Sequence, residues 1–104
     1  MMAQQRVISS FSNLREDHSN GKLQLGVSVT LEYLTITEID CGVGSIVLRD
    51  FRKSKMVCFM GKMGLLDNTG IGYLSFVNVT GTYHPSSSVI NDEFFRIYKI
   101  ERCG

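Results

Sequence analysis

The sequence predicts an all-β domain built as a small closed barrel. Residues 21–40 are rich in β-branched and aromatic side chains, which favour an extended, pleated backbone over a helix. Within this stretch Val27, Val29 and Leu31 alternate with polar residues, as in a strand with one buried face. The alternation breaks at Tyr33-Leu34, where we expect a β-bulge to admit one extra residue and bend the strand. A long, bent strand can pair with both halves of a small barrel, so this stretch is predicted to be its spine.

The length and composition fit one domain with one core. The chain has 104 residues, of which 43% are hydrophobic, a normal value for a globular protein. We therefore expect a single domain over residues 1–104, with a lead-in segment over 1–20 and the barrel over 21–104. The formal net charge is +1, from 11 Lys and Arg against 10 Asp and Glu. Overall charge thus favours neither a nucleic acid nor a membrane as partner, and only a local basic patch can do so.

Cysteine and histidine spacing argues against a metal site. Cys41, Cys58 and Cys103 are far apart, and His18 and His84 do not complete a set of closely spaced zinc ligands. We expect reduced thiols and an intracellular location. No basic-then-apolar leader is present, and no apolar run approaches the length of a membrane span. We therefore expect no cofactor, no metal and no membrane contact.

The first twenty residues leave two interpretations open. Val7, Ile8, Phe11 and Leu14 are spaced as on one face of a helix, although the serines among them weaken the pattern. The alternative is a short strand at residues 6–9 followed by a turn. A polar loop that ends in an Asn-Gly turn signal follows in either case.

Three strands are expected to meander through the first half of the barrel. A glycine-bearing turn at residues 40–44 leads from the long strand to a second strand at 45–50. A charged turn at 51–54 then leads to a third strand at 55–60. Connections this short join antiparallel strands, because a parallel crossover needs roughly a dozen residues or more.

The second half of the chain completes the barrel. After the third strand, Met63, Leu65 and Leu66 are expected to close one barrel end as a short helical turn. A fourth strand is predicted from residue 73 and a last strand at 93–101, separated by a loop with the only proline. This order of elements is that of a five-stranded OB-fold, a Greek-key barrel. An SH3-like barrel is the alternative, but it lacks so long a first strand.

No catalytic centre is indicated by the sequence. Nucleophilic catalysis needs a base within hydrogen-bond reach of the nucleophile, and His18 and His84 both fall in predicted loops. Gly-x-Ser-x-Gly, the phosphate-binding Gly-Lys-Ser/Thr and His-Glu-x-x-His motifs are absent. We therefore expect a protein that is not an enzyme and has no small-molecule substrate.

A basic turn is the strongest candidate for contact with nucleic acid. Lys and Arg side chains at a hairpin tip reach phosphates and release counterions, and an aromatic ring among them can stack on an unpaired base. The alternative is a solvated β-turn whose cations only shield the strand ends. The candidate residues in and beside this turn are Arg49, Phe51, Arg52, Lys53 and Lys55.

The last strand carries a second candidate surface. Alternate residues from 94 to 100 are expected on one face, with Phe95, Ile97 and Lys99 on the other. Arg96 beside Tyr98 suits base stacking and phosphate contact, and the same residue types also dominate protein interfaces. We assign Arg96 to the nucleic-acid surface. The residues assigned to a partner interface are Tyr73, Tyr83, Phe94, Tyr98 and Ile100.

The order of these segments resembles a known family. Residues 7–14, 26–35, 45–50, 73–81 and 96–100 are similar to the corresponding parts of small single-OB subunits in heteromeric single-strand DNA-binding complexes. The small subunit of the telomeric CST complex is the nearest in pattern, followed by that of replication protein A. The resemblance implies a nuclear subunit on telomeric chromatin. Such a subunit stabilises a larger OB-fold partner in a heterodimer and binds single-stranded DNA weakly.

The end of the sequence departs from that family. Its members commonly carry a C-terminal helix that packs on the partner, whereas this sequence stops at Gly104, soon after the last strand. If the resemblance holds, we expect the partner contact to use the barrel wall and residues 94–100. The alternative is a free-standing protein–protein interaction module, viral or cellular, with no nucleic-acid role. A salt-dependent affinity for an unstructured oligonucleotide distinguishes the two.

Overall fold

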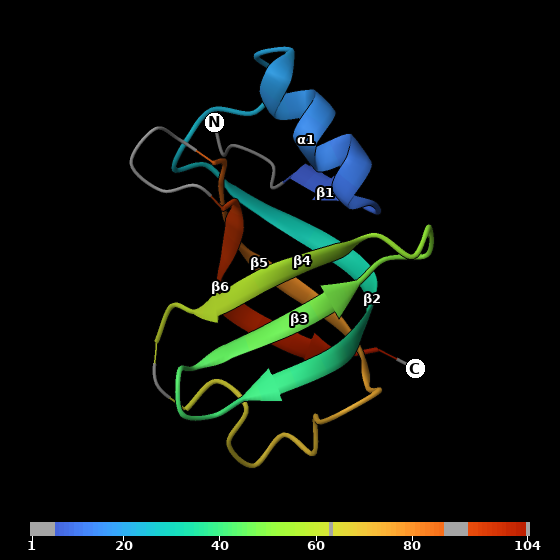
Figure 1. The fold of residues 1–104 in the computed structure, drawn as a ribbon, viewed down its shortest axis with the longest axis vertical. Coiled ribbons are helices and arrows are strands. Elements are labelled where there is room, and N and C mark those ends of the chain that lie inside the picture. Colours follow the sequence, from blue (N-terminus) through green and yellow to red (C-terminus); the bar gives the residue numbers. More distant parts are fainter. Residues whose placement is uncertain (1–5, 63, 87–91, 104) are drawn as a thin grey trace, which may run out of the picture.

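A β-sheet wrapped into a ring makes up most of the regular secondary structure, with one helix among the described residues (Figure 1). The computed structural model describes residues 6–62, 64–86 and 92–103. The prediction of a mainly β domain is confirmed. In chain order the elements are β1 (Arg6–Ile8), α1 (Phe11–Ser19), β2 (Ser28–Asp40), β3 (Ser45–Arg49), β4 (Lys55–Met60), β5 (Phe76–His84) and β6 (Phe94–Arg102).

Five of the strands close the ring. β2 pairs antiparallel with β3, and β3 pairs antiparallel with β4. β4 pairs parallel with β6, β6 pairs antiparallel with β5, and β5 returns to β2. β1 lies outside the ring as a sixth strand, parallel to the first part of β2. The arrangement is OB-like, and it supports the predicted five-stranded ring.

β2 pairs with strands in both halves of the ring because it bends at a bulge. Its register with β5 shifts between Leu31 and Leu34. Between them Tyr33 has a φ of 57°, in the left-handed region that bulky residues rarely adopt. Beyond the bulge β2 turns to pair with β3. The bulge predicted at Tyr33-Leu34 is thus confirmed.

Two strands begin later than predicted. β2 starts at Ser28, and Val27 before it is exposed rather than buried. β5 starts at Phe76 rather than Tyr73, because Leu74 has a φ of 66° and interrupts the extended backbone. Tyr73 therefore lies in the connection before β5, outside the strand.

The predicted helical turn between β4 and β5 does not form in the described residues. Gly64 and Asn68 have φ values of 78° and 59°, which a right-handed helix does not contain. Hydrogen-bonded turns occupy the segment instead. Leu65 and Leu66 nevertheless pack against the core, as expected of a segment that covers a barrel end. Met63 lies outside the described residues.

The N-terminal segment contains both of the alternatives that the sequence left open, a short strand followed by a helix. The hydroxyl of Ser10 caps α1 by accepting the amide of Asn13 at 3.1 Å. Phe11 and Leu14 lie one turn apart and are both completely buried. In Figure 1, α1 lies over one end of the barrel and the connection between β4 and β5 lies at the other.

Candidate functional site

Aromatic side chains from three strands meet on the outer face of the barrel. The rings of His84 and Phe94 stack with centroids 4.6 Å apart and planes 8° from parallel. Phe59 meets Phe94 edge to face at 5.3 Å. The guanidinium of Arg96 lies 5.9 Å from the centre of the Phe94 ring. Together with Tyr98, the neighbour of Arg96 on this face, these residues form what we call the aromatic platform.

Strand register brings the platform together. Phe59 lies opposite Arg96 in the β4–β6 pair, and His84 lies opposite Phe94 in the β5–β6 pair. Side chains of successive strand residues point to opposite faces, so a buried neighbour marks an outward-facing residue. The buried neighbours in the three strands are Cys58, Tyr83 and Phe95.

Tyr98 extends the platform, but Ile100 does not. β5 pairs with Ile97 and with Lys99 and skips Tyr98, which is therefore the extra residue of a bulge. The bulge reverses the alternation, so Tyr98 and Lys99 are both exposed and Ile100 turns into the core with 8% of its surface exposed. The expectation that Ile100 shares a face with Tyr98 was wrong, and Ile100 leaves the candidate interface.

Gly61 provides the space in which the Tyr98 ring lies. A Cβ atom at Gly61 would be 2.5 Å from Cε1 of Tyr98 and 2.7 Å from the carbonyl oxygen of Ile97. The amide of Gly61 donates to that same carbonyl at 2.6 Å. Because Gly61 follows directly after β4, the Tyr98 ring packs beside the strand that carries Phe59.

Within the platform, His84 is mainly neutral near pH 7. Burial, and then the positive charge of Arg96, lower the pKa of His84 from its ordinary value of 6.5. Its Nε2 atom shares a hydrogen bond with the hydroxyl of Thr82 at 2.9 Å. Arg96 is therefore the cation of the platform, set among uncharged rings.

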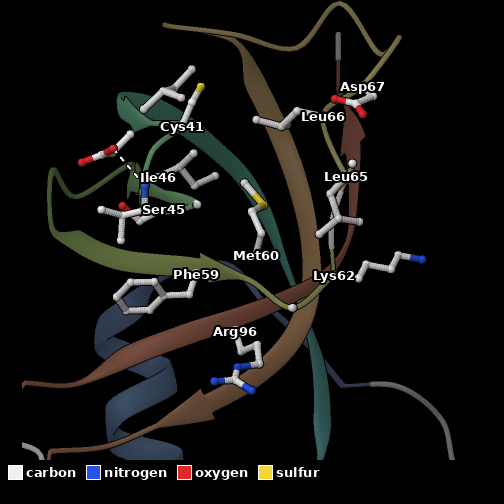
Figure 2. A pocket seen from close by; sticks show the side chains of 16 residues that line it. Cys41, Ser45, Ile46, Phe59, Met60, Lys62, Leu65, Leu66, Asp67 and Arg96 are labelled. Carbon is white, nitrogen blue, oxygen red and sulfur yellow. Dashed lines mark hydrogen bonds between the residues drawn. The ribbon is translucent and has the colours of Figure 1, made fainter.

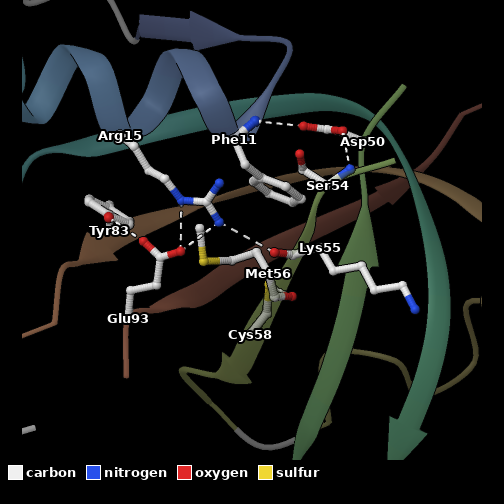
Figure 3. Close-up of polar contacts among 9 residues, drawn as sticks. All are labelled: Phe11, Arg15, Asp50, Ser54, Lys55, Met56, Cys58, Tyr83 and Glu93. Atoms are coloured by element: carbon white, nitrogen blue, oxygen red, sulfur yellow. Dashed lines mark hydrogen bonds and ion pairs between the residues drawn. The ribbon is translucent and has the colours of Figure 1, made fainter. Parts of the chain in front are cut away.

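Tyr83, predicted as a partner contact, belongs to an internal polar network instead (Figure 3). Only 6% of its surface is exposed. Its hydroxyl donates to Oε2 of Glu93 at 2.5 Å, and Oε1 of Glu93 accepts from Nε of Arg15 at 2.7 Å. The ring of His18 meets Tyr83 edge to face at 5.5 Å. The network joins α1 to the segment before β6, so Tyr83 is not available to a partner.

The pKa values in this network reflect the pairing of Glu93. Burial raises the pKa of Glu93, but the hydrogen bonds from Arg15 and Tyr83 and the charge of Arg15 outweigh burial and leave the pKa lowered. The hydrogen bond to Glu93 raises the pKa of Arg15, and burial followed by the same carboxylate raises that of Tyr83. A carboxyl group whose pKa is lower in the folded protein than in the unfolded chain stabilises the fold at pH values above its ordinary pKa. This stabilisation is lost as the pH falls through the pKa of the folded state.

We expect the Glu93→Gln variant to lose less stability in acid than the parent protein. The parent loses the contribution of the Glu93 carboxylate as pH falls below the ordinary carboxyl pKa of 4.5, whereas glutamine takes up no proton. The measurement is the urea midpoint of both proteins between about pH 6 and about pH 3. Glu101→Gln is the matched control, because Glu101 is exposed and pairs only with Lys99 among the described residues. Equal acid sensitivity in the parent and Glu93→Gln would contradict the assignment.

The predicted basic turn is exposed, and the amides of Arg52, Lys53 and Ser54 within it donate to Asp50. Phe51 is 65% exposed, and the guanidinium of Arg52 lies 5.4 Å from the centre of its ring. Lys53 is also exposed, whereas Arg49 is half-buried and lies opposite Lys55 in the β3–β4 pair. The turn therefore presents cations and one ring to solvent, as the sequence indicated.

The basic turn and the platform lie at different ends of β4. Lys55 begins the strand beside the turn, and Phe59 lies four residues further along. At the usual rise of a strand, four residues span roughly 13 Å. The predicted residues thus form two separate surfaces, with Arg96 on the platform and the other cations at or beside the turn.

A third exposed group of apolar residues lies where β2 meets β5. Tyr33 and Tyr73 are each 68% exposed, Leu74 is 52% exposed and Phe76 is 57% exposed. Phe76 begins β5 opposite the β2 residue Thr35, and the amide of Tyr33 donates to the side chain of Asn78 on β5. We call Tyr33, Tyr73, Leu74 and Phe76 the β2–β5 patch. Tyr73, predicted as a partner contact, belongs to this patch and not to the platform.

Phe59 and His84 were not predicted as site residues from the sequence. The alternation in β4 contains a usable signal, because Met56 and Cys58 are buried and Phe59 therefore points outward. The meeting of Phe59 with Phe94 depends on the parallel β4–β6 pair, which local sequence does not encode. His84 lay in a predicted loop, but β5 includes it as the last strand residue.

Metal ligands, a reactive thiol and a membrane-spanning helix were also considered for the described parts of the chain. No three His, Cys, Asp or Glu side chains in residues 6–62, 64–86 and 92–103 are placed to hold a metal ion. Cys58 is buried, and burial raises the pKa of its thiol. No described helix is long and apolar enough to cross a membrane.

Comparisons with known proteins bear on the fold. No protein-family profile and no curated protein matches the chain. The solved structure of the hypothetical protein YgiW from E. coli superposes with a TM-score of 0.60 at 12% identity, over 97% of this chain and 91% of YgiW. The chain has an OB-like fold.

A second solved structure matches equally well. Asparaginyl-tRNA synthetase of Entamoeba histolytica, in complex with asparaginyl-adenylate, superposes with a TM-score of 0.60 at 10% identity. The match covers 99% of this chain but 24% of the synthetase chain, so the chain spans about a quarter of that protein. At identities of 10% and 12%, the two matches show a shared fold and carry no information on activity.

Proposed function

We propose that this protein is a small OB-fold subunit that binds single-stranded DNA on the aromatic platform and works beside a larger OB-fold partner. The observation that supports this best is the group of rings around Phe94, with Arg96 beside them on an exposed face. Bases stack on such rings, and each stacked base contributes about 1–3 kcal/mol. In OB-folds the second and third barrel strands form an oligonucleotide-binding face. β4 holds the third place in this ring and contributes Phe59, whereas the other platform residues lie on β5 and β6.

Binding by this chain is expected to be weak and dependent on salt. The formal net charge is +1, so affinity for phosphates comes from Arg96 and from the cations of the basic turn. Three or four phosphate contacts to a single strand would give a slope of about −2 to −3 in a plot of log affinity against log salt concentration. The apolar surface of the platform supplies the remaining affinity, which changes little with salt.

The experiment is a fluorescence anisotropy titration of a labelled, unstructured oligonucleotide at several salt concentrations. Phe94→Ala is expected to weaken binding about tenfold with an unchanged salt slope, because it removes stacking and no charge. The double variant Arg52→Ala, Lys53→Ala is expected to make the salt slope shallower by about 1.4, since each phosphate contact to a single strand contributes about 0.7. Phe76→Ala is the matched control, an exposed phenylalanine on the β2–β5 patch. Parent-like binding by Phe94→Ala would rule out the platform as a stacking surface.

The partner and the cellular setting are proposed on the basis of the family resemblance. A larger OB-fold subunit would pair with this chain in the nucleus, on telomeric chromatin, as in the CST complex. The β2–β5 patch supports a partner contact, because exposed apolar patches commonly mark interfaces. In this proposal Phe94 and Tyr98, expected at the partner interface, contact nucleic acid instead.

The second candidate function is a protein–protein interaction module without a nucleic-acid role. The β2–β5 patch favours it, since Tyr33 and Leu74 are exposed and also have φ values of 57° and 66°. Strained backbone of this kind concentrates at functional sites. The anisotropy titration separates the two candidates, because an interaction module would show no salt-dependent affinity for the oligonucleotide.

A further inference from the structure

A groove continues the aromatic platform around one end of the barrel (Figure 2). It has a volume of about 600 Å³ and lies between the β2–β3 turn and residues 61–62 and 64–67. Volumes of roughly 300–1,000 Å³ are usual for sites that hold small molecules. Phe59 and Arg96 line the groove and also belong to the platform, so the two surfaces are continuous.

The walls of the groove are apolar and supported by the core. Ile46 is 1% exposed, and Met60, Leu65 and Leu66 are half-buried and packed against the core cluster. Figure 2 shows these side chains directed toward the same space. An apolar site of this kind, with a few polar groups at its rim, suits a flat ring that has polar edges.

The charges at the rim differ from end to end. Arg96 lies at one end of the groove, and Asp67 lies at the other (Figure 2). Arg96 contacts the Phe94 ring and has no ion pair with another described residue, so its guanidinium can meet a phosphate. Asp40, also on the rim, already accepts the amide of Val43 at 3.2 Å. Lys62 adds a second cation on the side of residues 64–67.

We propose that the groove holds one nucleobase of the single strand that stacks on the platform. This inference rests on the proposed function and extends it from a stacking surface to a path along the barrel. Bases stacked beside Phe94 lead to Arg96, which holds a phosphate, and the next base turns into the groove between Phe59 and Leu65. The carboxylate of Asp67 at the far end accepts a hydrogen bond from an exocyclic amino group, as carboxylates do from cytosine.

Cys41 provides a direct reporter of occupancy, because it lines the groove and is exposed. Cys58 is buried, and the half-buried Cys103 is removed by Cys103→Ser. In this background a maleimide modifies Cys41. Saturation with an unlabelled oligonucleotide of about 12 nucleotides, within the site sizes of OB-folds, is expected to slow that modification at least about fivefold.

A groove-filling variant gives an independent test. Val43 lines the groove and is 66% exposed, so Val43→Trp can place an indole in the groove without disturbing the core. We expect this variant to bind the oligonucleotide about tenfold more weakly with an unchanged salt slope. The matched control is Val7→Trp on β1, where the valine is 56% exposed and is not part of the groove.

The outcomes separate this inference from the proposed function. If Phe94→Ala weakens binding while Cys41 stays unprotected and Val43→Trp binds like the parent, the groove is empty and only the platform is used. If the parent binds no oligonucleotide, both proposals are overturned. Protection of Cys41 together with weaker binding by Val43→Trp supports the groove as a base site.

Discussion

Asp50→Ala is expected to lower the free energy of unfolding by about 3 kcal/mol or more, since a hydrogen bond to a charged group contributes about 1.5–3 kcal/mol. Asp50 is 4% exposed. Its Oδ2 atom accepts the amide of Phe11 at the start of α1, at 2.9 Å (Figure 3). Its Oδ1 atom accepts the amides of Arg52 and Ser54 at 2.9 and 3.0 Å. One carboxylate therefore joins the N-terminal helix to the basic turn, and its loss leaves the buried Phe11 amide without a partner.

Urea unfolding followed by circular dichroism measures this effect. Asp40→Ala is the matched control, because Asp40 is an exposed aspartate in the other hairpin turn and its carboxylate accepts one amide, that of Val43. We expect the control to change stability by less than about 1 kcal/mol. Similar unfolding midpoints for Asp50→Ala and the parent would show that the carboxylate does not anchor α1.

Gly81→Ala is expected to be at least as damaging, at about 3 kcal/mol or more, because overpacking costs most where neither neighbour can move. Gly81 is buried in β5 beside the bulge in β6. A Cβ atom there would lie 1.8 Å from the carbonyl oxygen of Arg96 and 2.9 Å from the ring of Phe95. The first obstacle is the backbone of the adjacent strand, and the second is a completely buried core ring. The overlap of the added Cβ atom with these groups is relieved only if β5 and β6 separate. Their separation would disturb the platform.

Gly72→Ala is the control for this substitution. A Cβ atom at Gly72 would meet nothing within 4 Å, and its φ lies outside the left-handed region. We expect thermal unfolding of Gly72→Ala to match that of the parent, whereas Gly81→Ala melts many degrees lower or does not fold. If the two variants have the same melting temperature, the close approach of β5 and β6 at Gly81 is less tight than the structure indicates.

The long bent strand and the antiparallel meander of the first three barrel strands could be predicted from the sequence because short-range signals determine them. The alternation and its break at Tyr33 indicated the long bent strand, and the short turns indicated antiparallel neighbours. The helical turn predicted near Leu65 does not form, because Gly64 and Asn68 on either side of it have positive φ values. The N-terminal helix was left open, because its serines weaken a helical pattern that Phe11 and Leu14 complete only by packing on the barrel.

The site was harder to predict because it depends on contacts between distant residues. Tyr83 was predicted as a surface aromatic, but in the structure its hydroxyl donates to Glu93. Glu93 in turn pairs with Arg15, which is 78 positions away in the sequence. Ile100 was predicted on the same face of the last strand as Tyr98, but the bulge in β6 reverses the alternation and turns Ile100 to the other face. For Ile100 the missing information is strand register, and for Tyr83 it is the contact with the Arg15–Glu93 pair. Both follow from tertiary packing and not from local pattern.

Binding of single-stranded DNA to the platform face of the barrel can be tested in solution. The most direct measurement is a titration of ¹⁵N-labelled protein with an unstructured oligonucleotide, followed by amide chemical shifts. We expect the amide signals of residues 59–61 and 94–98 to shift, and those of residues 33 and 73–76 in the β2–β5 patch to stay unchanged. Shifts confined to the β2–β5 patch, or no shifts at any oligonucleotide concentration, would contradict binding at the platform.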